Sequence, residues 1–182
     1  ELDRLVARSR LLGADPTLVL FGGGNTSSKI LETDHRGDER WVLRIKGTGS
    51  DLRTIEARHF AGLWLDDLLP LRERESLTDE EMLAYLSRCL VEADAPRPSI
   101  ETLLHGFLPA RHVDHVHADA ICALANAPDP KAAVREALGD DIAVAPYVRP
   151  GFGLAKIVAE FAGSRAVVLA HHGLVTWGDT HE

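Results

Sequence analysis

The stretch HVDHVHADA, residues 112–120, places three histidines within six positions of the chain. In an extended strand, residues two apart face the same side of the sheet and lie about 7 Å apart along the backbone. His115 and His117 are therefore expected to converge, while Val116 points to the opposite face. Two convergent imidazoles suit one divalent metal ion, and solvated histidines on an exposed strand face are the alternative. The direction of His112 stays open, because the sequence does not fix where the strand begins.

A third histidine would turn this pair into a metal site. The segment VVLAHHGLVTWG, residues 167–178, offers His171 and His172 at the end of an apolar strand. Adjacent strand residues face opposite ways, so only one of them is expected to join the pair, and Gly173 permits a sharp turn there. A buried histidine needs a partner, which is either the metal or a hydrogen-bond partner in the core. Three ligands suit a catalytic ion with open positions better than a closed structural site.

Glu101 lies in RPSIETLL, residues 97–104, within the first turn of a helix that Ser99 is predicted to cap. The helix dipole favours a carboxylate at this place, so capping is one interpretation of Glu101. The backbone N–H groups of Ser99, Ile100 and Glu101 at the helix start can also hold an anion. A carboxylate near both a metal and an anion would be placed for proton transfer.

Two glycine-rich turns, GGGNTSSK at 22–29 and KGTGS at 46–50, carry polar side chains. Neither has the pattern of a nucleotide-binding loop, because the first lacks both the G-K-[ST] of a P-loop and the third glycine of G-x-G-x-x-G. Successive backbone amides in such turns can cradle a phosphate, and tight hairpin turns are the alternative.

The composition limits the possible partners. With 182 residues, 45% of them hydrophobic, the chain can form one sizeable domain. A net charge of −8 without basic runs argues against nucleic acid, and no apolar run approaches the ~20 residues that cross a bilayer. Cys89 and Cys122 lie far apart and predict unpaired thiols in a reducing, cytoplasmic compartment. Because the sequence starts without Met and stops abruptly at TWGDTHE, we expect an excerpt of a longer polypeptide.

Hydrophobic periodicity and turn residues predict alternating helices and strands, without repeats or a linker, which favours one α/β domain over 1–182. Helices are predicted at 2–12, 78–93, 96–111, 130–139, 153–163 and in the second half of 113–127. Strands are predicted on both sides of the glycine turn in 17–31, in 40–52, at the start of 113–127, in 142–148 and in 165–178, while 60–71 is strand or irregular.

Five motifs stand in one order along the chain: GGNTS at 23–27, KGTGS at 46–50, PSIE at 98–101, HVHA at 115–118 and HGLVTWG at 172–178. In this order and spacing they resemble a class II aldolase/adducin-type domain over roughly 18–178. The longer segments around them are similar to the aldolase half of bifunctional rhamnulose-1-phosphate aldolase/short-chain dehydrogenase proteins.

The resemblance implies a three-layer α/β/α domain with a largely antiparallel central sheet, in homo-oligomers that are commonly tetramers. It also implies roles for single positions: metal ligands, usually for zinc, at His115, His117 and His172; a general acid/base at Glu101; and substrate-phosphate contacts at Asn25, Thr48, Gly49 and Ser99. Ile100 stands where many members have a second serine, so one phosphate donor is missing. His171 is expected beside the metal ligands rather than among them.

The reaction that the resemblance implies is reversible cleavage of a ketose 1-phosphate into dihydroxyacetone phosphate and an aldehyde such as lactaldehyde. Two alternatives stay open. One is a sugar-phosphate epimerase or dehydratase that keeps the metal, and the other is a non-enzymatic adducin-like interaction module. Such modules have typically lost the metal histidines, whereas all three are present here.

Overall fold

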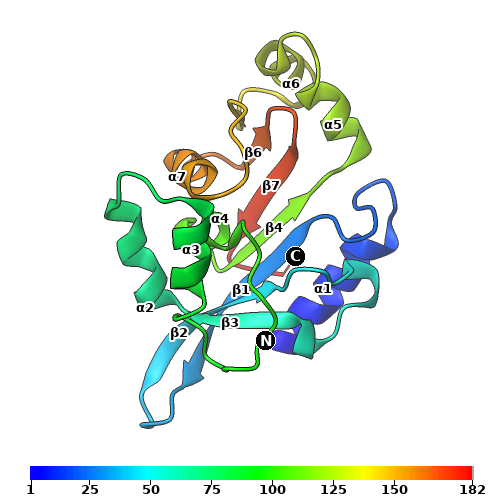
Figure 1. Cartoon of the computed structure of the whole chain (residues 1–182). Coiled ribbons are helices and arrows are strands. Elements are labelled where there is room, and N and C mark those ends of the chain that lie inside the picture. Colours follow the sequence, from blue (N-terminus) through cyan, green and yellow to red (C-terminus); the bar gives the residue numbers. More distant parts are fainter. Residues whose placement is uncertain (182) are drawn as a thin grey trace.

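A seven-stranded sheet forms the centre of the computed structural model, which describes residues 1–181 (Figure 1). Its strand order is β3-β2-β1-β4-β7-β6-β5, and every pairing is antiparallel except that of β5 with β6. The strands are β1 (Asn25–Thr33), β2 (Glu39–Lys46), β3 (Phe60–Trp64), β4 (His112–Val116), β5 (Ile142–Ala145), β6 (Ala166–Leu169) and β7 (Gly173–Gly178).

Helices cover both faces of the sheet, which confirms the expected three-layer α/β/α fold (Figure 1). One face carries α2 (Leu65–Leu68), α3 (Asp79–Leu86), α4 (Thr102–Phe107) and α7 (Phe152–Glu160). The other carries α1 (Leu2–Ala14), α5 (Asp119–Ala125) and α6 (Pro130–Leu138). Short 3-10 turns complete the chain: η1 (Leu52–Thr54), η2 (Ala57–His59) and η3 (Leu69–Glu73).

Strand β4 lies in the middle of the sheet and contributes to both layers of the core. Val113 packs in the large apolar cluster under α3, α4 and α7, whereas Val116 packs in a second cluster under α1. His115 pairs with Asn25 of β1 on one side and with Val175 of β7 on the other. The odd and even residues of β4 therefore face different helices, as the two-residue period of a strand requires.

The strand predicted before the first glycine turn is absent, since 16–24 form turns and irregular backbone. Asp15 causes this locally: its carboxylate accepts from the N–H and the hydroxyl of Thr17 at 2.9 and 2.7 Å, and its carbonyl accepts from Leu18 and Val19. An Asp side chain that satisfies nearby backbone N–H groups competes with strand formation. Val19 is buried, while Leu20 and Phe21 are exposed.

Two predicted helices are shorter than expected. The helix predicted at 78–93 begins with the expected Thr78–Glu81 capping box but ends at Leu86, because the next residues pair with β3: Trp64 N–H donates to Cys89 and Val91 N–H to Gly62. The helix predicted at 96–111 is reduced to α4, and Glu101 takes the N-cap position assigned to Ser99. Prolines at 96 and 98 keep the segment before α4 extended.

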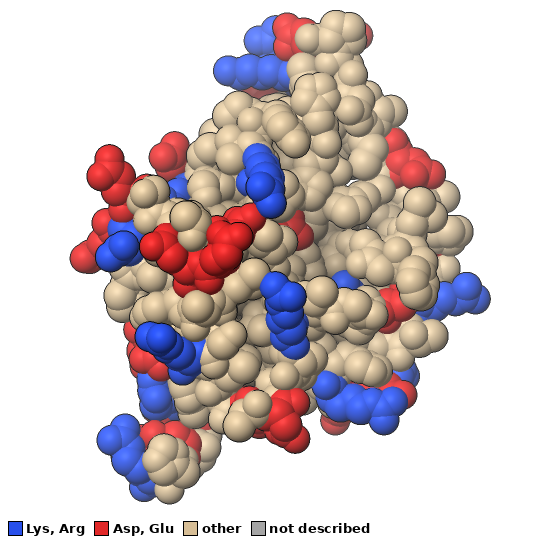
Figure 2. Space-filling view, in the orientation of Figure 1, with Lys and Arg blue, Asp and Glu red and all other residues tan. Residues whose placement is uncertain are grey.

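Among residues 1–181, no helix is both long and apolar enough to span a membrane. Figure 2 shows the largest group of acidic side chains at the left of the viewed face, with others at its top, right and bottom. Lys and Arg are scattered among them and form no continuous basic band on this face.

Candidate active site

His115 and His117 converge at the end of β4, as the alternation along the strand predicts. Nδ1 of the fully buried His115 lies 3.0 Å from the carbonyl oxygen of Leu174 in β7. Since a carbonyl only accepts, this nitrogen carries the proton and Nε2 keeps its lone pair. Nε2 of His117 lies 3.0 Å from Nε2 of His115. The two rings thus present nitrogen atoms to a common point.

His172 joins this pair from the turn between β6 and β7. Its ring centroid lies 4.7 Å from that of His115 and 5.2 Å from that of His117. Gly173 makes the approach possible, because a Cβ atom there would lie 2.5 Å from the Val116 carbonyl oxygen and 2.9 Å from Cδ2 of His117. We call His115, His117 and His172 the cavity cluster; one nitrogen atom of each lies within 4.8 Å of the other two.

His171 takes a different course from its neighbour. Its backbone has a φ of 57°, a left-handed conformation that residues with a Cβ atom adopt at some energetic cost. The ring contacts Asn126, with 3.0 Å between Nδ1 and Oδ1, and also Tyr147. The structure therefore brings His172, and not His171, to the other two histidines.

Glu101 places its carboxylate beside the cavity cluster. Oε1 lies 3.6 Å from Nε2 of His115 and 3.5 Å from Nε2 of His172, and it has no hydrogen-bond partner in the described chain. Oε2 accepts a hydrogen bond of 2.5 Å from Nδ2 of Asn25. The amide of Asn25 thus holds one carboxylate oxygen and leaves the other facing the histidines.

Burial sets the protonation of these groups. It lowers the pKa of His115 and of His172 to about 4, and it also lowers the pKa of His117. All three imidazoles are therefore neutral at pH 7. Burial raises the pKa of Glu101, while the positive charge of Lys46 and the hydrogen bond from Asn25 oppose that rise. A buried carboxylate with a raised pKa is a stronger base than one in water.

The four residues predicted to contact phosphate line one cavity of about 350 Å³ together with Glu101 and His117. Thr48 uses both of its hydrogen-bond donors within the protein. Its N–H donates to the Arg97 carbonyl at 2.9 Å, and its hydroxyl donates to the Pro98 carbonyl at 3.2 Å. These bonds hold the 46–50 turn against the segment that leads into α4. The cavity is thus formed where the two glycine turns meet the start of α4.

One detail of the predicted anion site is wrong. The Glu101 N–H, expected to be available to an anion, donates to the hydroxyl oxygen of Ser99 at 3.2 Å. The Ser99 hydroxyl retains its own hydrogen for donation into the cavity. Gly49 adopts a φ of 86°, and a Cβ atom there would meet nothing within 4 Å, so its backbone lies open to the cavity.

Sequence reasoning missed part of the cavity wall. Arg97 and Leu83 also line it. Lys46, the first residue of the KGTGS turn, lines it as well, with its side chain buried. Nζ of Lys46 donates to the Gly22 carbonyl at 3.3 Å, and burial lowers the pKa of this lysine, an effect that Asp51 and then Glu101 oppose. Lys46 belongs to a turn that the sequence had already singled out, and Arg97 lies just before Ser99; nothing in the sequence placed Leu83 of α3 near this site.

Comparison with known proteins identifies the family. The sequence model of the Class II Aldolase and Adducin N-terminal domain matches residues 3–182. The chain belongs to the class II aldolase and adducin family. The structure of the N-terminal class II aldolase domain of a conserved protein from Thermoplasma acidophilum is similar to it, with a TM-score of 0.94 and 46% identity over 100% of this chain and 85% of that one.

Two further relatives extend the comparison. YuxG from Bacillus subtilis (strain 168), described as an uncharacterized oxidoreductase, is 49% identical over 185 residues. The match takes in 100% of this chain and 27% of YuxG, so the chain spans about a quarter of that relative's length. L-Fuculose-1-phosphate aldolase from Thermus thermophilus has a TM-score of 0.60 and 20% identity over 98% of this chain and 82% of that one, a likeness of fold alone.

Class II aldolases typically depend on a divalent metal, and the cavity cluster of this family member fits one. Its three nitrogen donors are neutral, and the buried Oε1 of Glu101 beside them has no partner among residues 1–181. Leaving a buried carboxylate oxygen unpaired is costly, so a cation nearby would remove a penalty. Neutral imidazoles are also the usual ligands of zinc.

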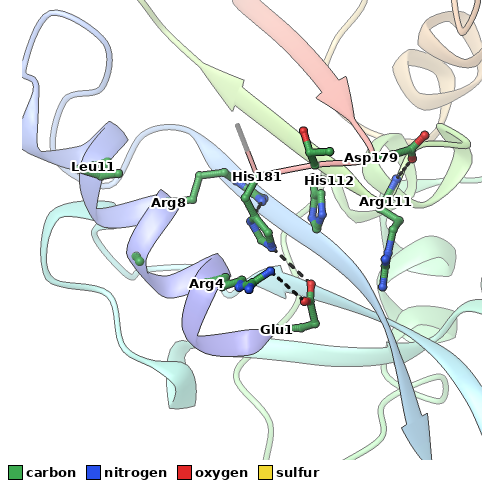
Figure 3. Close-up of a pocket in the computed structure, with 10 residues that line it drawn as sticks. Glu1, Arg4, Arg8, Leu11, Arg111, His112, Asp179 and His181 are labelled. Carbon is green, nitrogen blue, oxygen red and sulfur yellow. Dashed lines mark hydrogen bonds and ion pairs between the residues drawn. The ribbon is translucent and has the colours of Figure 1, made fainter.

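A second histidine group lies on the opposite face of β4, in a cavity of about 600 Å³ between α1 and the segment after β7 (Figure 3). We call Glu1, His112 and His181 the terminal cluster. The rings of His112 and His181 are 3.9 Å apart between centroids. Nδ1 of His112 lies 2.8 Å from the Ser28 hydroxyl, and Nδ1 of His181 lies 2.7 Å from Nη1 of Arg8. His112 thus faces away from the cavity cluster.

Proposed function

We propose that this domain catalyses the metal-dependent, reversible cleavage of a ketose 1-phosphate into dihydroxyacetone phosphate and an aldehyde, with rhamnulose 1-phosphate and lactaldehyde as the leading pair. One observation carries the proposal: the unpartnered Oε1 of Glu101 lies 3.5–3.6 Å from Nε2 atoms of two neutral, clustered histidines beside a cavity lined by two glycine turns. The family adds sugar-phosphate aldolases as fold relatives.

His115, His117 and His172 would hold the metal ion, for which zinc is the leading candidate. When bound, a divalent ion supplies Lewis-acid stabilisation of negative charge on the substrate's oxygen atoms. The rest of the chemistry falls to the chain. In the synthetic direction Glu101 removes a proton from the carbon beside the carbonyl group of dihydroxyacetone phosphate. The enediolate carbon then bonds to the carbonyl carbon of the aldehyde, and the aldehyde oxygen takes a proton from solvent to become the new hydroxyl group. The raised pKa of Glu101 strengthens this base, and Asn25 holds Oε2 so that Oε1 faces the cavity cluster.

The phosphate group would lie against the two glycine turns. Gly49 offers an open backbone and Ser99 a hydroxyl hydrogen, while Thr48 shapes the turn. Asn25 has a second N–H on Nδ2 that its bond to Glu101 does not use. The buried ammonium of Lys46 adds a positive charge at the same cavity, where Ile100 supplies no hydroxyl. A phosphate would therefore be recognised by local donors despite the net charge of −8.

We also propose that several copies of this chain assemble. We expect a homo-oligomer, with a tetramer as the family resemblance implies, in the cytoplasm. The exposed Leu20 and Phe21 beside the first glycine turn suit burial between copies.

YuxG extends far beyond the matched region, and neither glycine turn here has a dinucleotide pattern. We therefore place any hydride transfer outside this domain.

The test is turnover by the purified full-length protein, with its bound metal measured in the same preparation. Ketose 1-phosphates and pentulose 5-phosphates would be supplied separately, and release of dihydroxyacetone phosphate would be followed before and after chelation. We expect cleavage of a ketose 1-phosphate that chelation abolishes and zinc restores. Epimerisation or dehydration without cleavage would replace the aldolase assignment. Absence of both bound metal and turnover would favour an interaction module.

A further inference from the structure

Strand β1 carries an unusual run of buried polar side chains, Asn25 to Lys29, each of which is at most 7% exposed. Successive residues face opposite layers. Thr26 accepts or donates a 2.6 Å hydrogen bond with Ser9 of α1, and Ser28 contacts His112 on the same face. Polar residues in the centre of a sheet are costly unless each is paired, so a run of five with partners indicates a specific requirement.

The residues of β1 that face α4 are paired with that helix at regular intervals. Asn25 bonds to Glu101 at 2.5 Å, and Ser27 bonds to Nδ1 of His105 at 2.8 Å. Lys29 donates to the carbonyl groups that follow α4, at Leu108 and, at 2.8 Å, at Ala110. Two strand residues span about 6.6 Å and four helical residues about 6 Å, so the spacings match. The contacts form a polar ladder along α4.

The middle contact of this ladder is the pair of Ser27 and His105, which we call the middle rung. For stability alone, apolar side chains could take its place. His105 is fully buried, burial lowers its pKa well below the usual value, and its Nε2 has no partner within residues 1–181. Ser27 donates weakly to the Val113 carbonyl at 3.5 Å and so accepts from Nδ1. Apolar replacement of both members of a buried polar pair is often neutral or stabilising. What such a pair adds is a defined register between two elements.

The register matters because α4 is short and wholly buried. Its six residues are all buried, and the hydrogen bonds with β1 add directional contacts along its axis to this apolar packing. Glu101 stands directly before its first residue. We propose that Ser27 and His105 are positioning residues that fix α4 along β1 and thereby hold Oε1 of Glu101 at its distance from the cavity cluster. The inference rests on the proposed function, in which Glu101 moves the proton.

The decisive variant removes the rung without leaving a polar group unpaired: Ser27→Ala with His105→Leu, in the full-length protein. Displacement of a catalytic group by ~1 Å can cost about 10²-fold in rate. We therefore expect kcat for ketose 1-phosphate cleavage to fall by about 10–100-fold, with KM, metal content and the unfolding midpoint close to those of the parent. A kcat within twofold of the parent would show that the rung is merely structural and would overturn the proposal.

A matched control exists on the other face of the same strand. Ser9→Ala with Thr26→Val also removes one buried polar pair between β1 and a helix, but that helix is α1. We expect the control to keep the parent's kcat. If the double variant does not fold, the variants His105→Asn and His105→Gln still test the proposal. His105→Asn places an amide nitrogen near the position of Nδ1, whereas His105→Gln places it one bond farther from the backbone. kcat should be higher for His105→Asn than for His105→Gln, and equal values would contradict positioning.

A crystal structure of the Ser27→Ala/His105→Leu variant separates this inference from the proposed function. If the parent lacks aldolase activity, the structure still reports whether α4 slides along β1. We expect the Glu101 carboxylate to move relative to His115 and His172 while β1 and β4 stay in place. A carboxylate at the parent's position in the variant would refute the positioning role, whatever the reaction.

Discussion

The two histidine clusters use opposite faces of one strand, and their surroundings differ in the atoms that approach the rings. In the cavity cluster the Leu174 carbonyl takes the Nδ1–H of His115, which leaves Nε2 able to bind a metal. In the terminal cluster the Arg8 guanidinium approaches Nδ1 of His181. Arginine only donates, so the proton of a neutral His181 must be on Nε2. That nitrogen lies 3.4 Å from Oε2 of Glu1, where its hydrogen suits the carboxylate.

Proximity of histidines alone does not make a metal site. Both clusters bring three ligand atoms within 4.8 Å of one another, and both contain rings whose pKa burial lowers. Only the cavity cluster combines free lone pairs with an unpartnered carboxylate oxygen. In the terminal cluster, a metal at His181 would have to displace the hydrogen on Nε2 or the Arg8 contact.

Alanine variants should separate the clusters most strongly. His115→Ala, His117→Ala or His172→Ala removes one of three ligands, and we expect zinc affinity to fall by more than the roughly 10–100-fold that is typical of changes around a metal ligand. His112→Ala should leave zinc content unchanged. Bound metal in purified variants, measured by elemental analysis, is the readout. Stoichiometric zinc in His117→Ala, or loss of zinc in His112→Ala, would contradict the assignment of the metal to the cavity cluster.

Gly173 tests the steric basis of the cavity cluster. Gly173→Ala would put a methyl group against the Val116 carbonyl and the His117 ring, so we expect loss of roughly 1–3 kcal/mol in the free energy of unfolding and weaker zinc binding. Gly178→Ala, at the far end of the same strand, would meet only the Thr180 carbonyl at 4.0 Å and is the control. Denaturant unfolding and zinc titration measure both effects. Equal behaviour of the two variants would show that the turn has room for a side chain.

Acid should destabilise the metal-free protein through both clusters. His112, His115 and His172 have folded-state pKa values of about 4, below the ordinary 6.5. Between these values the unfolded chain binds protons that the folded chain does not, so the free energy of unfolding falls as pH decreases from 6.5 to 4. Thermal unfolding at several pH values measures this decline. A midpoint that stays constant over this range would contradict the neutral burial of these rings.

Zinc sharpens the same measurement. Ligand nitrogen atoms must be unprotonated to bind it, so zinc should raise the unfolding midpoint at pH 7.5 and do so less at pH 5. This zinc effect should disappear in His172→Asn and persist in His112→Asn. A zinc effect of equal size in both variants would mean that the stabilising ion binds somewhere else.

Much of the fold could be predicted from local patterns. Alternation along residues 113–117 placed His115 and His117 on one face, and the Thr78–Glu81 capping box began a helix where expected. The apolar run at 18–21 was wrongly predicted as a strand, because its pattern is that of a strand while the Asp15 carboxylate turns the backbone just before it. A hydrophobic pattern shows which side chains prefer burial, but it does not show where a local side-chain hydrogen bond replaces strand pairing.

The site was predictable only in part, for physical reasons. Geometry along the sequence left open which of His171 and His172 would join the pair, and the family resemblance favoured His172. The left-handed backbone at His171, visible only in three dimensions, sends that ring to Asn126. The pairing of Ser27 with His105 joins residues 78 positions apart, so no local pattern contains it.

The most direct test of the account is Glu101→Gln in the full-length protein. Gln keeps the shape of the side chain and can still accept from Asn25, but it cannot take a proton. We expect bound metal and substrate affinity to be retained. Cleavage and exchange of the dihydroxyacetone phosphate α-proton with solvent should fall together by about 10²–10⁴-fold, since both require that proton transfer. If exchange continues at the parent's rate while cleavage is lost, Glu101 is not the base.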